Sequence, residues 1–91
     1  MSKTELVQKY ISLFWYFDKS KIEEISDDVL VEFILNYGDL EAVRELFKTL
    51  EINKVAQIFK NKAFTERSNY FPQVKNYFNL VFQKHVPEYT L

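Results

Sequence analysis

The scarcity of chain breakers most constrains this 91-residue sequence, which contains one glycine and two prolines. Hairpins and sheet turns depend on such residues, so strands would have few places at which to reverse direction. The large apolar residues instead recur at spacings of three and four, which is the period of one helix face. The sequence therefore predicts an all-α fold.

Apolar stripes indicate about five helices in one small domain spanning residues 1–91, with residues 1–2 and 87–91 frayed. The predicted boundaries are a first helix over 3–17, a cap at Ser26 or Asp27 for the second, a cap at Asp39 for the third, a cap at Asn53 for the fourth, a loop over 63–71 and Pro72 as the first residue of the fifth. A chain of this length can bury only one small core.

The inward faces of these helices predict which side chains form that core. The predicted inward residues are Leu6, Val7, Tyr10, Ile11, Leu13, Phe14, Phe17, Val29, Leu30, Phe33, Ile34, Tyr37, Leu40, Val43, Leu46, Phe47, Leu50, Val55, Ile58, Phe59, Val74, Tyr77, Phe78, Val81 and Phe82. Phe33, Phe47, Phe59 and Phe78 are expected to be buried, whereas Leu80 lies off the last stripe.

Gly38 is the single glycine, and it lies between the predicted end of the second helix and the Asp39 cap. Glycine at this place commonly ends a helix in the left-handed conformation, so a positive φ is predicted. Asp27 and Asp28, at the opposite end of the predicted second helix, are interpreted as first-turn charges that complement the helix dipole.

Charge is unevenly distributed along the chain. Residues 1–52 carry 6 Lys and Arg against 11 Asp and Glu, a balance of −5, whereas residues 53–91 carry 6 against 2, a balance of +4. One interpretation is that the two halves attract each other or solvate their own helices. The other is that the basic half meets an acidic partner or nucleic acid.

Catalytic and metal-binding patterns are missing from the sequence, which has no cysteine and one histidine, His85. A single imidazole supplies neither a nucleophile–base pair nor a metal site, and one glycine excludes a glycine-rich phosphate loop. We therefore expect a protein that is not an enzyme and takes no cofactor or metal. The lack of cysteine, of a signal-peptide pattern and of a long apolar run predicts a cytoplasmic protein without membrane contact.

The aromatic run in LFWYFD, residues 13–18, is larger than one helix face can bury. Phe14 and Phe17 fall on the predicted inward face, whereas Trp15 and Tyr16 flank it. Tryptophan and tyrosine concentrate binding energy at interfaces, so these two residues are predicted to bind a partner protein. The alternative is that Trp15 closes the core against the last helix.

A second function is a small DNA-binding regulator that uses the basic half. The third and fourth predicted helices have the spacing of a helix-turn-helix. The fourth carries side chains that can reach phosphates and base edges, namely Lys54, Gln57, Lys60, Asn61 and Lys62. The acidic third helix counts against this reading, and any two short packed helices give the same spacing.

The segments LFWYFD, LNYGDLEAVRELFKTL and VKNYFNLVF resemble a family of short bacterial proteins of unassigned function. Members are encoded beside abortive-infection type nucleotidyltransferases, which act as toxins. The matching residues are Leu13, Phe14, Trp15, Asn36, Tyr37, Gly38, Asp39, Leu40, Leu46, Phe47, Asn76 and Phe78. The chain departs from the pattern at Val43 and Glu45, where the family has tryptophans, and at Leu50 and Glu51, where a glycine usually follows the third helix.

This resemblance implies an antitoxin, a protein-interaction module that binds a nucleotidyltransferase. The chain itself is expected to be a monomer or a weak homodimer, and an aromatic-rich homodimer is a third possibility.

Overall fold

The computed structural model describes residues 2–14, 24–66, 68–87 and 89. Its elements are α1 (Lys3–Lys9), a 3₁₀ turn η1 (Ile11–Phe14), α2 (Asp27–Tyr37), α3 (Leu40–Leu50), α4 (Ile52–Ala63) and α5 (Pro72–His85). The described ranges contain no strand, so the all-α prediction is confirmed.

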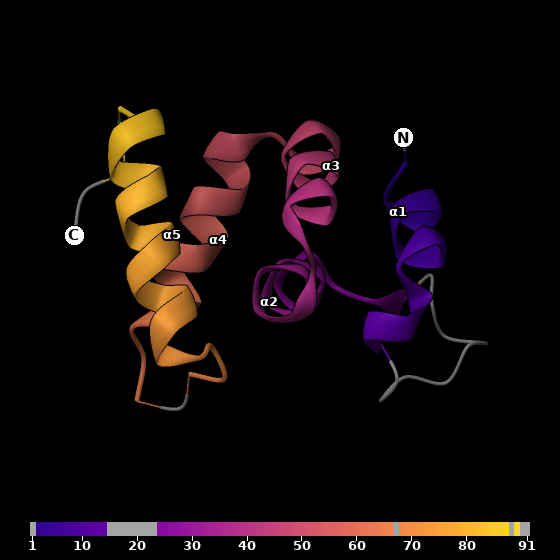
Figure 1. Cartoon of the computed structure of the whole chain (residues 1–91), viewed down its shortest axis with the longest axis horizontal. Helices are drawn as coiled ribbons and strands as arrows, with labels where there is room; N and C mark the ends of the chain where they lie inside the picture. The colour runs from indigo at the N-terminus through magenta and orange to yellow at the C-terminus, as the bar shows by residue number, and fades with distance from the viewer. Residues whose placement is uncertain (1, 15–23, 67, 88, 90–91) are drawn as a thin grey trace.

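The helices form one small bundle with principal extents of 37 × 28 × 20 Å. In Figure 1, α5, α4 and α3 stand side by side, α2 is seen end-on below α3, and α1 lies at the end opposite α5. Helix α2 packs against both α3 and α4, and α1 packs against α3. The arrangement leaves α5 as an outer helix.

Three of the predicted helix starts are confirmed by their caps. The Ser26 side chain accepts a hydrogen bond from the backbone N–H of Val29 (3.3 Å), and Asp39 accepts one from Ala42 (2.8 Å). Pro72 occupies the first turn of α5, where its missing N–H is not needed. These starts follow from local chemistry alone.

The first helix is shorter than predicted, because α1 ends at Lys9 and the chain continues as the 3₁₀ turn. Tyr10 leaves helical geometry with φ −111° and ψ 32°, at the point where its hydroxyl donates a 2.6 Å hydrogen bond to Glu45 of α3. The same carboxylate lies 2.7 Å from the Lys9 ammonium. The hydrogen bond to Glu45, aided by desolvation, raises the pKa of Tyr10 to about 12.

Gly38 separates α2 from α3 as predicted, but its backbone is extended, with φ −79° and ψ 160°. The predicted positive φ is therefore wrong. A Cβ at this position would lie 2.6 Å from the Ile34 carbonyl oxygen and 3.0 Å from the Ala42 Cβ. Glycine is needed here because a Cβ would clash with the Ile34 carbonyl oxygen in the last turn of α2.

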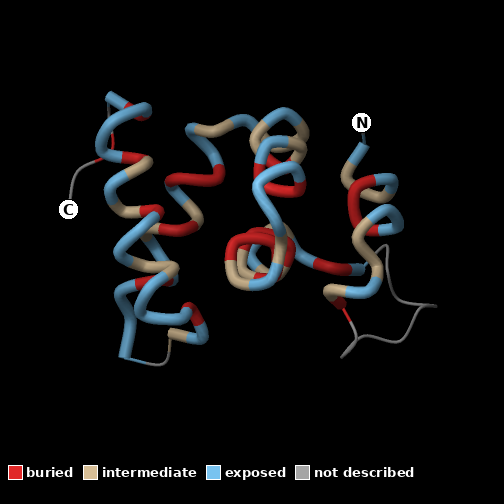
Figure 2. Tube along the Cα trace, in the orientation of Figure 1, coloured by how far each residue is buried: buried red, intermediate tan, exposed pale blue. Residues whose placement is uncertain are grey.

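The core is aromatic at its centre. Phe59 of α4 and Phe82 of α5 are fully buried, with ring centroids 5.3 Å apart. Phe33 and Phe78 are also buried, whereas Phe47 is half-buried and packs against the core. Figure 2 shows the buried positions in red, which are densest on α2, while much of α5 is pale blue.

Three predicted core residues are exposed instead. Tyr37, Leu40 and Tyr77 are 42%, 61% and 58% exposed, while Leu80 is exposed at 65%, in keeping with its place off the stripe. Leu40 and Tyr77 line an open space between α3 and α5. Conversely, several buried residues lay outside the predicted stripes, namely Ile25, Val31, Leu35, Ala42, Ala56, Ala63, Tyr70, Val86 and Tyr89.

The expected fraying of the tail does not extend to Tyr89. Its ring packs 5.6 Å from Phe82, and its hydroxyl hydrogen-bonds to the Asn79 side chain (3.0 Å). A buried tyrosine with a satisfied hydroxyl contributes both apolar area and a specific hydrogen bond. The tail at Tyr89 is thereby held against α5.

The link between α3 and α4 contains an unusual backbone conformation. Glu51 has φ 67° and ψ 138°, the one positive φ among the described non-glycine residues. It precedes Ile52, the first residue of α4, so Asn53 lies inside the helix and the predicted Asn53 cap is wrong. A side chain in this region costs about 1–3 kcal/mol, whereas glycine adopts it freely.

We expect Glu51→Gly to raise the free energy of unfolding by about 1 kcal/mol, because glycine relieves the strain at this position. Chemical denaturation followed by circular dichroism measures the change. Glu51→Ala is the matched control, since it removes the carboxylate but keeps the Cβ, and it should give no such gain. Equal stabilisation by both variants would show that the charge, not the backbone, is responsible.

Candidate partner-binding groove

An open groove of about 650 Å³ lies between α3 and α5. Its lining is Leu35, Gly38, Asp39, Leu40, Val43, Arg44, Phe47, Ile52, Tyr77, Phe78, Val81 and His85. Helices α3 and α5 run in the same direction, as Figure 1 shows. Asp39 therefore marks one end of the groove and His85 the other.

Aromatic contacts hold the two walls in place. Phe47 of α3 lies 5.8 Å from Phe82 of α5, which also contacts Phe59 of α4. Phe78 contacts both Phe82, at 5.9 Å, and Tyr77, at 5.0 Å and near-perpendicular. The contact between Phe47 and Phe82 therefore joins the two walls of the groove.

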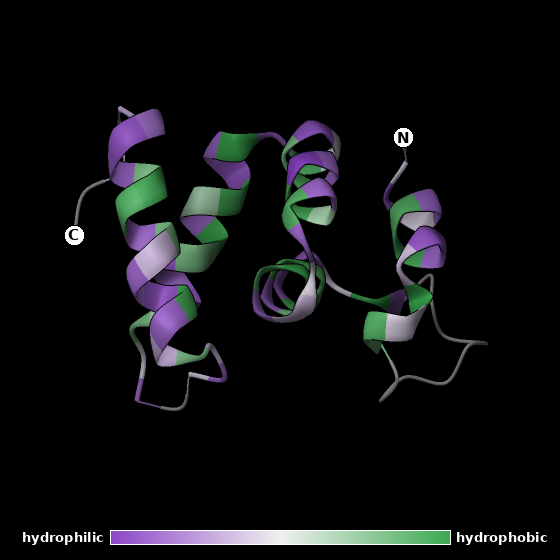
Figure 3. Cartoon of the chain, viewed as in Figure 1, coloured by the Kyte–Doolittle hydropathy of each residue, from purple (hydrophilic) through white to green (hydrophobic). Residues whose placement is uncertain are grey.

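The groove presents apolar surface to solvent. Leu40 on one wall and Tyr77 on the other are more than half exposed. Hydrophobic and hydrophilic residues alternate along α3 and α5 in Figure 3, as expected of helices with one face in the core. Exposed apolar residues gathered around a concavity are typical of binding surfaces, whereas isolated ones are ordinary.

A guanidinium and an imidazole side chain border this apolar lining. Arg44 and His85 are both exposed, and neither makes a hydrogen bond or ion pair with the described residues. Asp39 is already engaged, since its carboxylate caps α3. The groove therefore offers an apolar surface flanked by an unpaired guanidinium and an imidazole.

The sequence prediction located this site only in part. Trp15 and Tyr16, the predicted partner-binding residues, lie outside the described residues. Leu40 and Tyr77 were predicted to be core residues. The apolar stripes on α3 and α5 were the sequence signal that could have identified them as groove residues. Five residues shared with the family resemblance line the groove, namely Gly38, Asp39, Leu40, Phe47 and Phe78.

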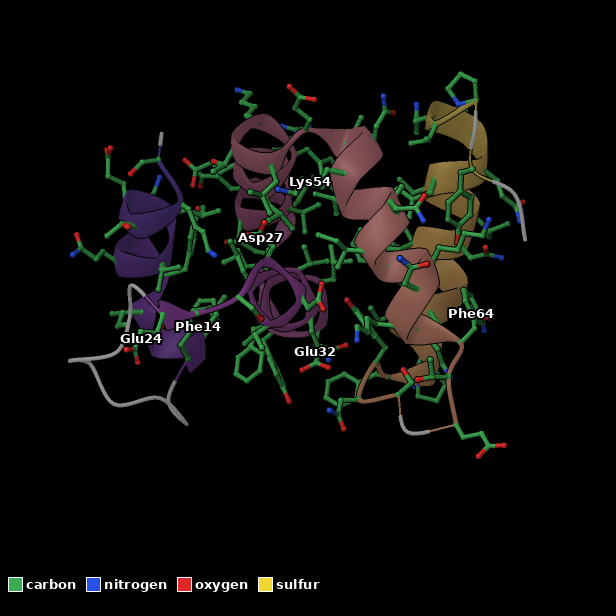
Figure 4. The ribbon with its side chains drawn as sticks, turned by 180° about the vertical axis from the view of Figure 1, so that it is seen from behind. Phe14, Glu24, Asp27, Glu32, Lys54 and Phe64 are labelled. Carbon is green, nitrogen blue, oxygen red and sulfur yellow. The ribbon has the colours of Figure 1, made fainter. Side chains whose placement is uncertain are left out.

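The alternative nucleic-acid residues of α4 lie on a partly neutralised face. The Lys54 ammonium is 2.9 Å from the Asp27 carboxylate, and the Lys62 ammonium is 3.6 Å from Asp28. Figure 4 shows Lys54 and Asp27 pointing toward one another. Gln57 and Asn61 hydrogen-bond to each other at 3.4 Å, and Lys60 is half-buried. The first-turn carboxylates of α2 thus attract the basic half of the chain.

Asp27 is the centre of this charge network. It also lies 2.9 Å from the Lys3 ammonium of α1, so one carboxylate joins α1, α2 and α4. The hydrogen bonds from Lys54 and then Lys3 lower the pKa of Asp27 below its ordinary value of 3.8. The same contact with Asp27 raises the pKa of Lys54.

Two further features of the described residues bear on the kind of site. Among the described residues, no three histidine, cysteine or carboxylate side chains are grouped closely enough to hold a metal ion. Within the same ranges, none of the helices is both long and apolar enough to cross a bilayer. Comparison of the chain with protein-family profiles, curated proteins and solved structures finds no match in any of the three.

Asp27→Asn should lower the free energy of unfolding at pH 7 by about 0.5–1 kcal/mol, the upper range for a partly exposed ion pair. Because the pKa of Asp27 is depressed in the folded state, its stabilisation is present above the ordinary value and is lost as pH falls through the folded pKa. The difference between wild type and variant, measured by urea denaturation, should therefore disappear at low pH.

Asp28→Asn is the control for this experiment. It occupies the same helix turn and shares the dipole interaction, but it is half exposed and its single ion pair is longer. A smaller loss is expected from it. Equal losses from the two variants, or an Asp27 effect that persists in acid, would contradict the bridging role.

Proposed function

We propose that this chain is a protein-interaction module whose groove between α3 and α5 binds an amphipathic helix of another protein. The observation that carries the proposal is the apolar lining, open to solvent at Leu40 and Tyr77 and bordered by the unpaired Arg44 and His85. Binding of an apolar helix face in a hydrophobic groove is a recurrent recognition mode.

The chemistry of the groove defines the partner helix. Its apolar residues would recur at spacings of three and four, to cover Leu40, Val43 and Val81 along the parallel walls. Acidic residues on its flank would meet Arg44 and His85. Tyrosine and arginine are the residue types that most often dominate interface energy, and Tyr77 and Arg44 are placed to do so.

The family resemblance supplies a specific partner. We propose that the chain is a cytoplasmic antitoxin, and that its partner is the nucleotidyltransferase toxin encoded beside it. The presence of Gly38, Asp39, Leu40, Phe47 and Phe78 in the groove lining supports this reading, because these residues carry the resemblance. On this proposal the described chain acts by occupying a surface of the toxin, with no chemistry of its own.

A DNA-binding role has less physical support. Lys54 and Lys62 already pair with carboxylates of α2, so a phosphate would have to displace those partners. Nucleic-acid affinity depends mainly on free cations that neutralise phosphates. The α4 face offers fewer of them than the sequence indicated.

The proposal predicts that Leu40→Glu and Tyr77→Ala each weaken binding to the adjacent-frame protein at least about tenfold, a change of about 1.4 kcal/mol. Both residues are largely exposed, so the unfolding transition should move little. A glutamate is compatible with the first turn of α3 because it complements the helix dipole. Titration calorimetry gives the dissociation constants.

Leu80→Glu is the matched control, since Leu80 is an equally exposed apolar residue of α5 that does not line the groove. It should leave affinity within about twofold. Equal weakening by all three variants would place the interface elsewhere. Salt-sensitive binding to duplex DNA that is lost when Lys54, Lys60 and Lys62 are changed to Gln would favour the regulator instead.

A further inference from the structure

A second pocket, of about 450 Å³, lies between α2 and the loop that precedes α5. Its lining is Glu32, Phe33, Asn36, Tyr37, Asn69 and Phe71, none of which lines the groove. The pocket therefore does not share its residues with the proposed partner-binding site.

Three aromatic rings form its apolar side. The Tyr37 ring stands nearly perpendicular to Phe71, at 85° and 5.4 Å, and at 68° and 5.8 Å to Phe33. Tyr37 and Phe71 are each 42% exposed, so their rings are open to a ligand. Perpendicular rings present both a face and an edge to the same space, and an aromatic face attracts cations.

Asn36 fixes the opposite wall. Its side-chain nitrogen donates to the Asn69 carbonyl oxygen (3.1 Å), and its side-chain oxygen accepts from the Phe71 backbone N–H (3.2 Å). The Asn36 amide group thereby joins the loop to α2 through two hydrogen bonds. The pocket is held open before any ligand arrives, which reduces the entropy cost of binding.

Glu32 gives the pocket its charge. Its carboxylate makes no ion pair or hydrogen bond with the described residues, and none of the described residues that line the pocket is basic. The nearby acids of α2 differ, since Asp27 and Asp28 each have a lysine partner. Figure 4 shows Glu32 on a different side of α2 from Asp27. An unneutralised carboxylate beside open ring faces is complementary to an organic cation.

We propose that this pocket binds the guanidinium group of an arginine side chain from a partner protein. A guanidinium is planar, so it can stack on Tyr37 while it donates two parallel hydrogen bonds to Glu32. It is also more weakly hydrated than a lysine ammonium and loses less on entering an aromatic site. The carboxylate and the rings together therefore select arginine over lysine.

The test uses the full-length, isotope-labelled chain titrated with acetyl-Gly-Arg-Gly-amide at low salt. Nuclear magnetic resonance follows the Asn36 side-chain amide and the Phe71 backbone amide, which report on the pocket wall. Matched peptides carry lysine, or citrulline, which keeps the shape of arginine without its charge. Saturable shifts are expected with arginine, binding about threefold or more weaker with lysine, and none with citrulline.

Two variants assign the binding to this pocket. Glu32→Gln and Tyr37→Leu should each weaken the arginine peptide by about three- to tenfold, whereas Glu41→Gln, on α3, should leave it unchanged. Glu32→Gln keeps the size of an incompletely buried side chain, so it tests the site even if Tyr37→Leu alters the fold. Equal shifts from all three peptides, or an affinity for the arginine peptide that Glu32→Gln leaves unchanged, would overturn the proposal.

Discussion

The packing of the Phe82 ring is the interaction on which the rest of this structure depends. Its fully buried ring contacts Phe47, Phe59, Phe78 and Tyr89, at centroid distances of 5.3–5.9 Å. These contacts fasten the outermost helix to α3 and α4 and hold the tail against it. Removing a buried phenylalanine of this kind costs about 3–5 kcal/mol, a large share of the stability of a small domain. The second wall of the groove exists because this ring is anchored.

A single carboxylate plays the corresponding role at the other end of the bundle. Asp27 meets Lys3 of α1 and Lys54 of α4, so the acidic first half and the basic second half attract each other where three helices converge. This contact accounts physically for part of the uneven charge along the chain. It also reduces the cationic surface that a nucleic acid could use, which is why the apolar groove gives a better guide to function.

The fold could be predicted from the sequence because its signals are local. Ser26, Asp39 and Pro72 start helices through bonds and angles within one turn, and the helical period marks one apolar face on each segment. The period does not reveal whether a neighbouring helix covers all of that face. Leu40 and Tyr77 therefore looked like core residues, although they border the groove.

Features set by tertiary packing could not be predicted in this way. Gly38 is needed because a Cβ there would clash with the Ile34 carbonyl oxygen, and the residue pattern does not reveal that contact. The second pocket depends on Asn36 reaching a loop more than 30 residues away, through hydrogen bonds to Asn69 and Phe71. The strained backbone at Glu51 likewise has no signal in the sequence, because glutamate gives no sign of a positive φ.

Hydrogen–deuterium exchange of the chain, alone and mixed with the protein encoded beside it, tests the central claim most directly. If the groove is the binding surface, backbone amides in α3 and in the second half of α5 should gain protection in the complex, while the amides of α1 should not change. The lack of a complex, or protection confined to the lysine-bearing face of α4, would contradict the assignment of the groove between α3 and α5 as the partner-binding site.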